Sequence, residues 1–508
     1  MHYKFISKKI GLFLGIALFI LLLCIPTPPG IDISAKRAAA CAILMAVFWI
    51  SDAIPLPVTA ILPLVLYPIF KIVNAKEVAL SYADRNIFLF LGGFIIAMAM
   101  QRHNLHKRIA LVIISVIGTS TKRIVLGFMV ATAFLSMWVS NTATAMMMYP
   151  IGMAMIMHVQ TALKKENPNF SIKNGKFNFA IALMLGIAYG ASIGGIGTLI
   201  GTPPNIIFAG ISKSLFPQMP EIDFLQWMII GIPIVIVFLP LTWVYLVYLG
   251  APPDIRNIPG SKELIKKELH SLGKLSTGEL LTLIVFCLTA LSWIFRKDIR
   301  IGSMTITGWS GLLGIEAYVH DSTVAVFGAI LLFIIPTNFK THEFILNWEW
   351  AKRIPWGILI LFGGGFALAL SFKSTGLDKY IGSIFNNTSS FSILLIIVFI
   401  CLLLTFLTEI TSNTATISMM LPILAAIAVA FHIHPYIFMM PATLATSFAF
   451  MMPVATPPNA IVFGSEYITI QQMVKTGFLL NLVGVIVITL AMYFIAFPLF
   501  GITFGKLF

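Results

Sequence analysis

The stretch "SNTAT" occupies Ser140–Thr144, and the same five residues return at Ser412–Thr416. The first copy lies within residues 124–163 and the second within residues 410–465, and neither run contains Asp, Glu, Lys or Arg. Hydroxyl and amide groups in apolar surroundings are costly unless they have hydrogen-bond partners. Two copies in equivalent surroundings therefore predict a shared function for these stretches.

The composition is that of a membrane protein. Of 508 residues, 59% are hydrophobic and 10% are charged, and the mean hydropathy is +0.97, whereas soluble domains have about 25% charged residues. A bilayer core needs about 20 apolar residues per spanning helix. Some apolar runs are longer than this and others are shorter. We therefore expect an all-α polytopic membrane protein that also contains hairpins and broken helices.

The formal net charge of +14 does not indicate a nucleic-acid partner. Lys and Arg occur in short blocks between the apolar runs, as in the segment 262–274, and such blocks determine orientation in the membrane. They predict a cytoplasmic N-terminus, with residues 26–35 as the first external loop. The lipid bilayer is thus the expected surrounding of the chain.

The sequence does not indicate an enzyme. Four cysteines have no paired spacing and predict neither a disulfide framework nor a metal cluster. "HDST" at 320–323 stands at the start of an apolar run without an oxyanion loop. No other nucleophile or cofactor loop appears in the apolar runs. A transporter is favoured, and an anion channel is the alternative from another class.

Internal repeats divide the chain into two halves. "FLFLGGF" at 88–94 matches "ILFGGGF" at 360–366 with an offset of 272 residues, the same offset that separates the SNTAT copies. "GTPPN" at 201–205 is similarly matched by "ATPPN" at 455–459. Two membrane repeats around one binding site are a recurring transporter plan, in which inverted repeats provide alternating access. The number of spans between the repeats leaves their relative orientation open.

These repeats give an expected domain organisation. Residues 1–50 are expected to form N-terminal scaffold helices, 51–250 the first repeat, 251–320 a connection with one surface helix and one membrane span, and 321–508 the second repeat. Each SNTAT copy provides helix-capping side chains near the middle of an apolar run. We therefore expect re-entrant hairpins at about 122–158 and about 390–431.

The TPPN motifs predict a second kind of break. Two successive prolines remove backbone N–H donors and disfavour helix at the preceding threonine. Irregular backbone at membrane depth persists only where it is buried in protein or lines a polar cavity. The carbonyl groups of 190–201 and 447–455 then become available as cation ligands. Glu409 is a further candidate, as a functional ionisable group or as a structural cap of the hairpin.

The polar groups at these four breaks suit a cation and an anion together. Hydroxyl, amide and carbonyl oxygens are the ligands that hard cations prefer. Helix N-termini bind anions, because their free N–H groups and their dipole both favour negative charge. A carboxylate could be held by these donors and by the bound cations. The breaks therefore predict coupled binding of Na⁺ and an oxyanion.

The same motifs resemble the divalent anion:sodium symporter family, close to its bacterial sodium-dependent dicarboxylate transporters. The resemblance rests on "TEITSNTAT" at 408–416, "GIGTLIGTPPN" at 195–205 and "WGILILFGGGF" at 356–366, and it extends over nearly the whole chain. It implies a homodimer in the cytoplasmic (inner) membrane. Each protomer would have about 11 transmembrane helices and two re-entrant hairpins in two inverted repeats, and would work by an elevator mechanism.

The resemblance also implies which residues bind the ions and the substrate. The first Na⁺ site would comprise Ser136, Ser140, Asn141, Gly194, Gly195 and Gly197. The second would comprise Thr408, Thr411, Asn413 and Ala455, and Ala455 replaces a glycine of some relatives. Substrate carboxylates would contact Asn141, Thr142, Asn413, Thr414, Thr456 and Pro457.

The implied function is Na⁺-coupled import of C4-dicarboxylates such as succinate, malate and fumarate, with two or more Na⁺ ions. A sodium-coupled sulfate or tricarboxylate transporter and a sodium-independent dicarboxylate exchanger are alternatives.

Overall fold

The computed structural model describes residues 2–118, 120–166, 175–255, 260–301, 304–338, 340, 342–385 and 392–502. Within these residues, nine helices are long and apolar enough to cross a membrane. They are Ile33–Ser51, Ala75–Arg102, Asn141–Thr161, Asn178–Gly195, Phe224–Gly250, Thr277–Ile294, Trp356–Thr375, Asn413–Ala430 and Ile470–Leu499. Four shorter apolar helical segments accompany them. The chain is thus a mostly helical polytopic membrane protein.

The N-terminal region is a helical pair followed by short helices. Asp32 begins the second helix of the pair, since its carboxylate accepts a hydrogen bond from the backbone N–H of Ser34 at 2.7 Å. Prolines stand in the first turns of the next two short helices, where the missing N–H has no helical partner to lose. The elements are α1 (His2–Cys24), α2 (Ile33–Ser51), α3 (Leu56–Ala60), α4 (Leu62–Ile69) and α5 (Ala75–Ser81).

The next eight elements correspond, in order, to the last elements of the chain. The first set is α6 (Arg85–Arg102), α7 (Leu105–Ile117), α8 (Thr121–Ser136), α9 (Asn141–Glu166), α10 (Asn178–Gly195), α11 (Pro203–Leu215), α12 (Phe224–Tyr245) and η1 (Leu246–Gly250). The second set is α18 (Trp356–Thr375), α19 (Leu377–Phe385), α20 (Ile393–Thr408), α21 (Asn413–Ala430), α22 (Tyr436–Ala445), α23 (Pro457–Phe463), α24 (Ile470–Ala491) and η2 (Met492–Ala496). A short helix, α25 (Phe497–Leu499), follows. Both sets end in a π-helical turn, so the correspondence extends beyond the sequence motifs.

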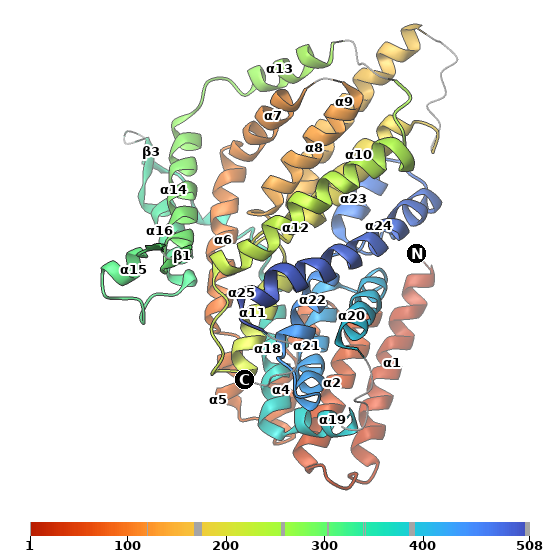
Figure 1. Ribbon diagram of the computed structural model, residues 1–508, viewed down its shortest axis with the longest axis vertical. Helices are drawn as coiled ribbons and strands as arrows, with labels where there is room; N and C mark the ends of the chain where they lie inside the picture. Colours follow the sequence, from red (N-terminus) through yellow and green to blue (C-terminus); the bar gives the residue numbers. More distant parts are fainter. Residues whose placement is uncertain are drawn as a thin grey trace.

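A third group of elements connects the two sets; its part from α14 to β3 protrudes at one side of the molecule, while α13 lies at the top (Figure 1). Helices α14 and α16 of this group pack against α6. Its two small sheets are antiparallel pairs, β1 with β2 and β3 with β4. The elements are α13 (Ser261–Ser271), α14 (Thr277–Ile294), β1 (Ile299–Ile301), β2 (Met304–Ile306), α15 (Trp309–Leu312), α16 (Asp321–Ile334), β3 (Pro336–Asn338), β4 (Glu343–Phe344) and α17 (Trp348–Ala351).

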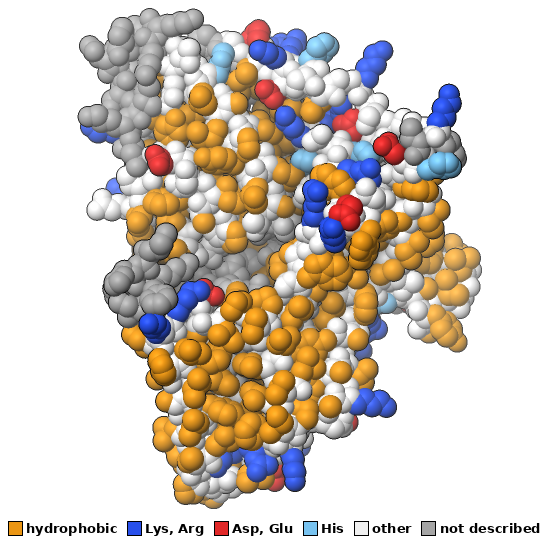
Figure 2. All heavy atoms as spheres, turned by 180° about the vertical axis from the view of Figure 1, so that it is seen from behind, with side chains coloured by type: hydrophobic (Ala, Val, Ile, Leu, Met, Phe, Trp, Pro, Cys, Tyr) orange, Lys and Arg blue, Asp and Glu red, His pale blue; other side chains and the backbone are white. Residues whose placement is uncertain are grey.

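Helix α10 lies in the centre of the protein. Every residue from Phe179 to Gly195 is buried, and the helix packs against α8, α9, α12 and α23. Helices α12 and α24 run side by side across the molecule (Figure 1). The outer surface is also apolar, as Figure 2 shows for most of the lower half of one face. Apolar residues inside and outside are expected for a protein whose surroundings are lipid.

Candidate functional site

The first SNT break separates α8 from α9. Ser136, the last residue of α8, is fully buried, and its hydroxyl donates to the Ala191 carbonyl at 2.7 Å. It also lies 2.7 Å from the Asn141 amide at the start of α9. The Asn141 amide nitrogen faces the carbonyl oxygens of Ala191 and Gly201, each 3.2 Å away, because a carbonyl can only accept. The break is thus connected to α10 and to the residues that follow it.

The second SNT break repeats this geometry between α20 and α21. The buried Thr408 hydroxyl lies 3.2 Å from the Thr446 carbonyl and within hydrogen-bond distance of the Asn413 side-chain amide, and it can donate its single proton to either. Thr411 and Thr416 share a hydrogen bond of 2.7 Å between their hydroxyl groups. Each break therefore joins a hydroxyl at the end of one helix to an asparagine at the start of the next.

Capping by the motif side chains occurs at only two of the four breaks. The Ser140 hydroxyl accepts from the Ala143 N–H at 3.4 Å, and the Thr456 hydroxyl accepts from the Asn459 N–H at 3.3 Å. Ser412 and Thr202 occupy the corresponding capping positions and make no such bond. The expectation that SNT caps the following helix is therefore wrong for the second copy, whose serine hydroxyl is left free for another partner.

Two asparagines hold the broken backbone before the proline pairs. The Asn205 amide donates to the carbonyls of Gly195 at 3.1 Å and Thr198 at 2.7 Å. Asn459 donates to carbonyls that lie ten and seven residues earlier in the same way, both at 3.0 Å. The asparagine that ends each TPPN motif could have indicated this role, but we did not predict it from the sequence.

The glycine-rich segment is more helical than expected. We expected released carbonyls from residue 190 onward, but α10 continues to Gly195 and only the residues after it are irregular. A Cβ atom on Gly194 would lie 2.2 Å from the Ala133 carbonyl oxygen, and one on Gly195 would lie 2.4 Å from the Asn141 side chain. One on Gly197 would lie 3.0 Å from the Met137 side chain. The three glycines therefore allow α10 and the break to approach the first hairpin closely.

The carboxylate of Glu409 organises the second break. It accepts hydrogen bonds from the backbone N–H groups of Phe450 and Met451 at 2.8 and 2.9 Å and from that of Met452 at 2.9 Å. The Asn481 amide donates to it at 2.7 Å. The residue is 3% exposed, and all its partners are neutral donors. Glu409 therefore caps the irregular segment rather than the hairpin itself.

The remaining predicted site residues differ in exposure. Thr142 and Thr414 are half-buried, and in the described structure their side chains have no protein partner. Ala455 is buried, and its N–H donates to the Met452 carbonyl at 3.1 Å. Pro457 is exposed. The two threonines thus have hydroxyl groups available to a ligand.

The two halves exchange contacts at the breaks. Helix α9, which follows the first SNT, packs against α23, which follows the second TPPN motif. Helix α21, which follows the second SNT, packs against α11, which follows the first TPPN motif. In addition, the Tyr189 hydroxyl donates to the Phe450 carbonyl at 3.0 Å. Residues more than 200 positions apart are thereby brought into one polar region within an apolar core.

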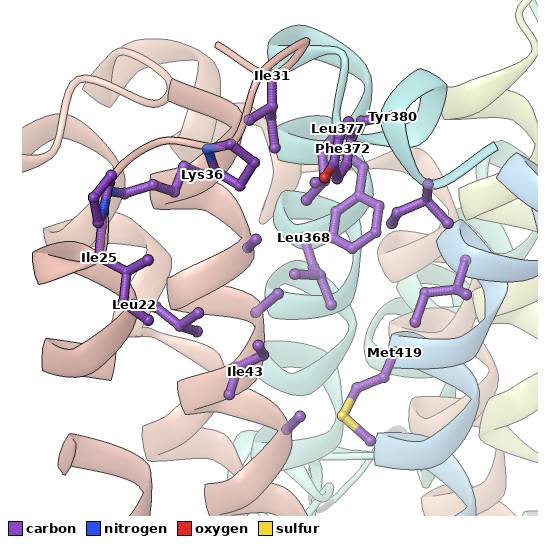
Figure 3. Close-up of a pocket in the computed structure, with 17 residues that line it drawn as sticks. Leu22, Ile25, Ile31, Lys36, Ile43, Leu368, Phe372, Leu377, Tyr380 and Met419 are labelled. Carbon is purple, nitrogen blue, oxygen red and sulfur yellow. The ribbon is translucent and has the colours of Figure 1, made fainter. Parts of the chain in front are cut away.

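An apolar cavity of about 370 Å³ lies elsewhere, between α2, α18, α19 and α21 (Figure 3). Its walls include Ile43, Leu368 and Met419. The ammonium group of Lys36 at its edge donates to the carbonyls of Leu23 and Ile25. The cavity lacks the convergent amides and hydroxyls of the breaks, so it does not have the chemistry to bind a small dianion.

The chain matches the family described as the sodium:sulfate symporter transmembrane region over residues 7–502. It belongs to this family. The symporter is 45% identical over 498 residues to the sodium-dependent dicarboxylate transporter SdcS of Staphylococcus saprophyticus, covering 98% of this chain and 93% of the relative. It is 46% identical to the protein of the same name from Staphylococcus aureus, with the same coverage. The family resemblance inferred from the motifs is confirmed.

Solved structures support the fold of the symporter. MtrF of Neisseria gonorrhoeae, described among antimetabolite efflux pumps, is 12% identical with a TM-score of 0.56, covering 96% of both chains. The YdaH transporter of Alcanivorax borkumensis is 13% identical with a TM-score of 0.53, covering 82% of this chain and 86% of its own. The family match and the curated relatives identify the symporter as a multi-pass transporter of the cytoplasmic membrane, in agreement with the prediction that it is not an enzyme.

Proposed function

We propose that this symporter imports C4-dicarboxylates such as succinate, malate and fumarate together with two or more Na⁺ ions. The observation that carries the proposal is the pair of equivalent polar breaks in a chain that is 45% identical to sodium-dependent dicarboxylate transporters over nearly its whole length. The breaks provide uncharged oxygen ligands and helix N-termini, which suit Na⁺ and a carboxylate respectively.

Each Na⁺ ion would bind at one break. For the first ion the available oxygens are those of Ser136, Ser140 and Asn141, with backbone carbonyls of the Gly194–Gly197 segment. For the second they are those of Thr408, Thr411 and Asn413, with the backbone at Ala455. The fit is supported by the close packing of each asparagine on the hydroxyl at the end of the preceding helix. Loading a cation there would also raise the affinity for an anion nearby.

The dicarboxylate would lie between the two hairpin tips. Among the described residues, the hydroxyl groups of Thr142 and Thr414 have no hydrogen-bond partner, and each threonine follows an asparagine whose amide can turn toward a ligand. The N-termini of α9 and α21 add partial positive charge. Thr456 and Pro457, at the second TPPN motif, would also line the substrate site. One carboxylate at each tip accounts for the presence of two equivalent motifs.

Transport would proceed by an elevator mechanism in a homodimer with about 11 spans per protomer. The two sets of elements would be inverted repeats. The moving part would comprise the hairpins α8–α9 and α20–α21 together with α10–α12 and α22–α24. A scaffold would comprise α1–α6 and α14–α18. The scaffold would thus include α3–α6 of the expected first repeat, 51–250, and α16–α18 of the expected second repeat, 321–508. Within that second repeat, residues 339, 341, 386–391 and 503–508 lie outside the described residues.

Sulfate is the second candidate substrate, because the family that matches residues 7–502 is described by sodium and sulfate. A tricarboxylate is a further candidate. Competition distinguishes these candidates: unlabelled succinate, sulfate and citrate are added in turn to an uptake assay. We expect succinate to compete and sulfate to have little effect. If sulfate competed more strongly than succinate, sulfate would be the proposed substrate instead.

The coupling is tested with purified protein in proteoliposomes. Uptake of labelled succinate is measured with an inward Na⁺ gradient and with K⁺ replacing Na⁺. We expect accumulation only with Na⁺ and a steeper than linear dependence on its concentration. Equal uptake in K⁺, stimulated by succinate inside the vesicles, would instead indicate an exchanger.

A further inference from the structure

A cluster of charged residues surrounds the loop between α11 and α12. It contains two carboxylates of the loop and five groups from α6 and from the connection between α14 and α16. We call it the interface cluster, and its members are Arg85, Glu221, Asp223, Arg296, Lys297, His320 and Asp321. None of these residues belongs to the proposed ion or substrate sites.

Three pairs in the interface cluster join the loop to its surroundings. Arg85 and His320 both contact the same oxygen of Glu221, at 2.8 Å each. Lys297 lies 3.5 Å from a carboxylate oxygen of Asp223. Burial would raise the pKa of Glu221, but the hydrogen bond with His320 and the charge of Arg85 outweigh it and lower that pKa. The loop carboxylate is therefore held in its charged form by groups on two other elements.

A buried ion pair extends the interface cluster. Arg296 and Asp321 are 3% and 1% exposed, and their side chains lie 2.5 Å apart. The second oxygen of Asp321 accepts from the backbone N–H of Phe224, the first residue of α12, at 2.9 Å. A carboxylate of the connection thus caps α12 from outside its own helix. Moving α12 would remove this partner from a buried carboxylate.

Aromatic packing connects the interface cluster to the first hairpin tip. The ring of Phe224 stacks on Trp293 of α14 at 4.5 Å and on Trp138 at 6.0 Å. Trp138 stands two residues before the first SNT and also packs against Phe286 of α14. The first tip is therefore docked on the connection between the two sets.

In the part of the chain that the structure describes, the second hairpin tip has no such contact. Ile410 corresponds to Trp138 by the 272-residue offset, and it is 68% exposed. Val454 corresponds to Ile200 before the TPPN motif; it is 70% exposed, whereas Ile200 is 6% exposed. In this conformation, therefore, the first tip contacts the connection and the second tip does not. A contact that forms in only one state of a transporter with inverted repeats would show this difference.

We propose that the interface cluster holds the moving part against the scaffold in this conformation and separates in every transport cycle. The proposal rests on the proposed elevator function. Within the described residues, each ion pair of the loop, and the hydrogen bond from the Phe224 N–H to Asp321, crosses the boundary between α11–α12 and the group of α6, α14 and α16. The pairs must therefore break if one part slides past the other.

The test uses cross-linking in the full-length protein. The four native cysteines are replaced by serine, and Arg85→Cys is combined with Glu221→Cys. Proteoliposomes are treated with a short thiol cross-linker, and the cross-linked fraction is measured after cleavage at a protease site inserted between the two residues. We expect succinate uptake to fall at least tenfold in the cross-linked protein, while Na⁺-dependent succinate binding in detergent changes less than twofold.

A matched pair controls for the chemistry. Asn338→Cys with Glu343→Cys joins cross-strand partners of β3 and β4 within the scaffold, so its cross-linking should leave uptake unchanged. Lys297→Cys with Asp223→Cys provides a second pair across the boundary, in case the first does not fold.

Full uptake by either fully cross-linked boundary pair would overturn the proposal, because the two elements would then move together. The proposed function has its own readout. Absence of Na⁺-dependent binding and uptake in the protein that has not been cross-linked would contradict the function, independently of the interface cluster.

Discussion

Replacing Asn205 or Asn459 with aspartate tests whether the irregular backbone before each proline pair must be held in place. Each asparagine amide donates to two buried carbonyl groups at 2.7–3.1 Å. Alanine would leave one carbonyl at each break unpaired, that of Gly195 or Ala449, because the other carbonyl also accepts from the backbone N–H of Gly201 or Ala455. The cost is about 1–3 kcal/mol per break. Since 1.4 kcal/mol is a factor of ten, the held geometry would become at least about fivefold less populated.

Aspartate has nearly the shape of asparagine but presents acceptors to acceptors. Its oxygen would face carbonyl oxygens at hydrogen-bond distance, and in its protonated form it could satisfy only one of them. We therefore expect Na⁺-driven succinate uptake to decrease in the order asparagine, alanine, aspartate. Uptake by each variant is normalised to its amount of monodisperse protein. Asn347→Ala is the matched control, because this exposed amide caps α17 far from the breaks. Aspartate variants with more than half of the normal uptake would refute the reasoning.

Three further predictions concern single side chains. Gly194→Ala places a Cβ 2.2 Å from a backbone oxygen, whereas Gly195→Ala displaces only the Asn141 amide. Thermal unfolding should therefore show the larger decrease in melting temperature for Gly194→Ala. Gly195→Ala should fold, but its succinate uptake should be abolished. Glu409→Gln keeps the volume but turns an N–H₂ group toward one of three backbone donors, which costs about 1.5–3 kcal/mol; a melting temperature equal to that of the original protein would contradict this. Thr408→Val removes the hydroxyl but preserves shape, and it should raise the Na⁺ concentration for half-maximal uptake at least tenfold, while Thr405→Val, one turn earlier, should not.

Much of the architecture could be predicted from the sequence because the determinants are local. Proline pairs break helices wherever they occur, so α11 and α23 begin where the TPPN motifs stand. The 272-residue offset likewise located both helix–break–helix segments, since α9 and α21 start at the asparagines of the two SNT copies. The family followed from the same motifs.

Other features depend on tertiary contacts and could not be predicted. The function of Glu409 required knowing that residues 450–452 would fold back onto it. The serines of the two SNT copies differ in capping although their sequences are identical. The interface cluster combines residues separated by more than 200 positions. Identical motifs therefore define equivalent positions, but their surroundings decide what each side chain does.

The exchange of partners between the halves has a consequence for biosynthesis. Helix α11 packs against α21, which begins at residue 413. At about 5–20 residues per second, the ribosome needs roughly 10–40 s to reach α21 after completing α11. During that interval the first half is inserted in the membrane without the surface that its broken helix will contact. Part of the packing surface of each half is therefore supplied by the other, and we expect a chain truncated before α21 to leave α11 accessible to the quality-control machinery of the membrane.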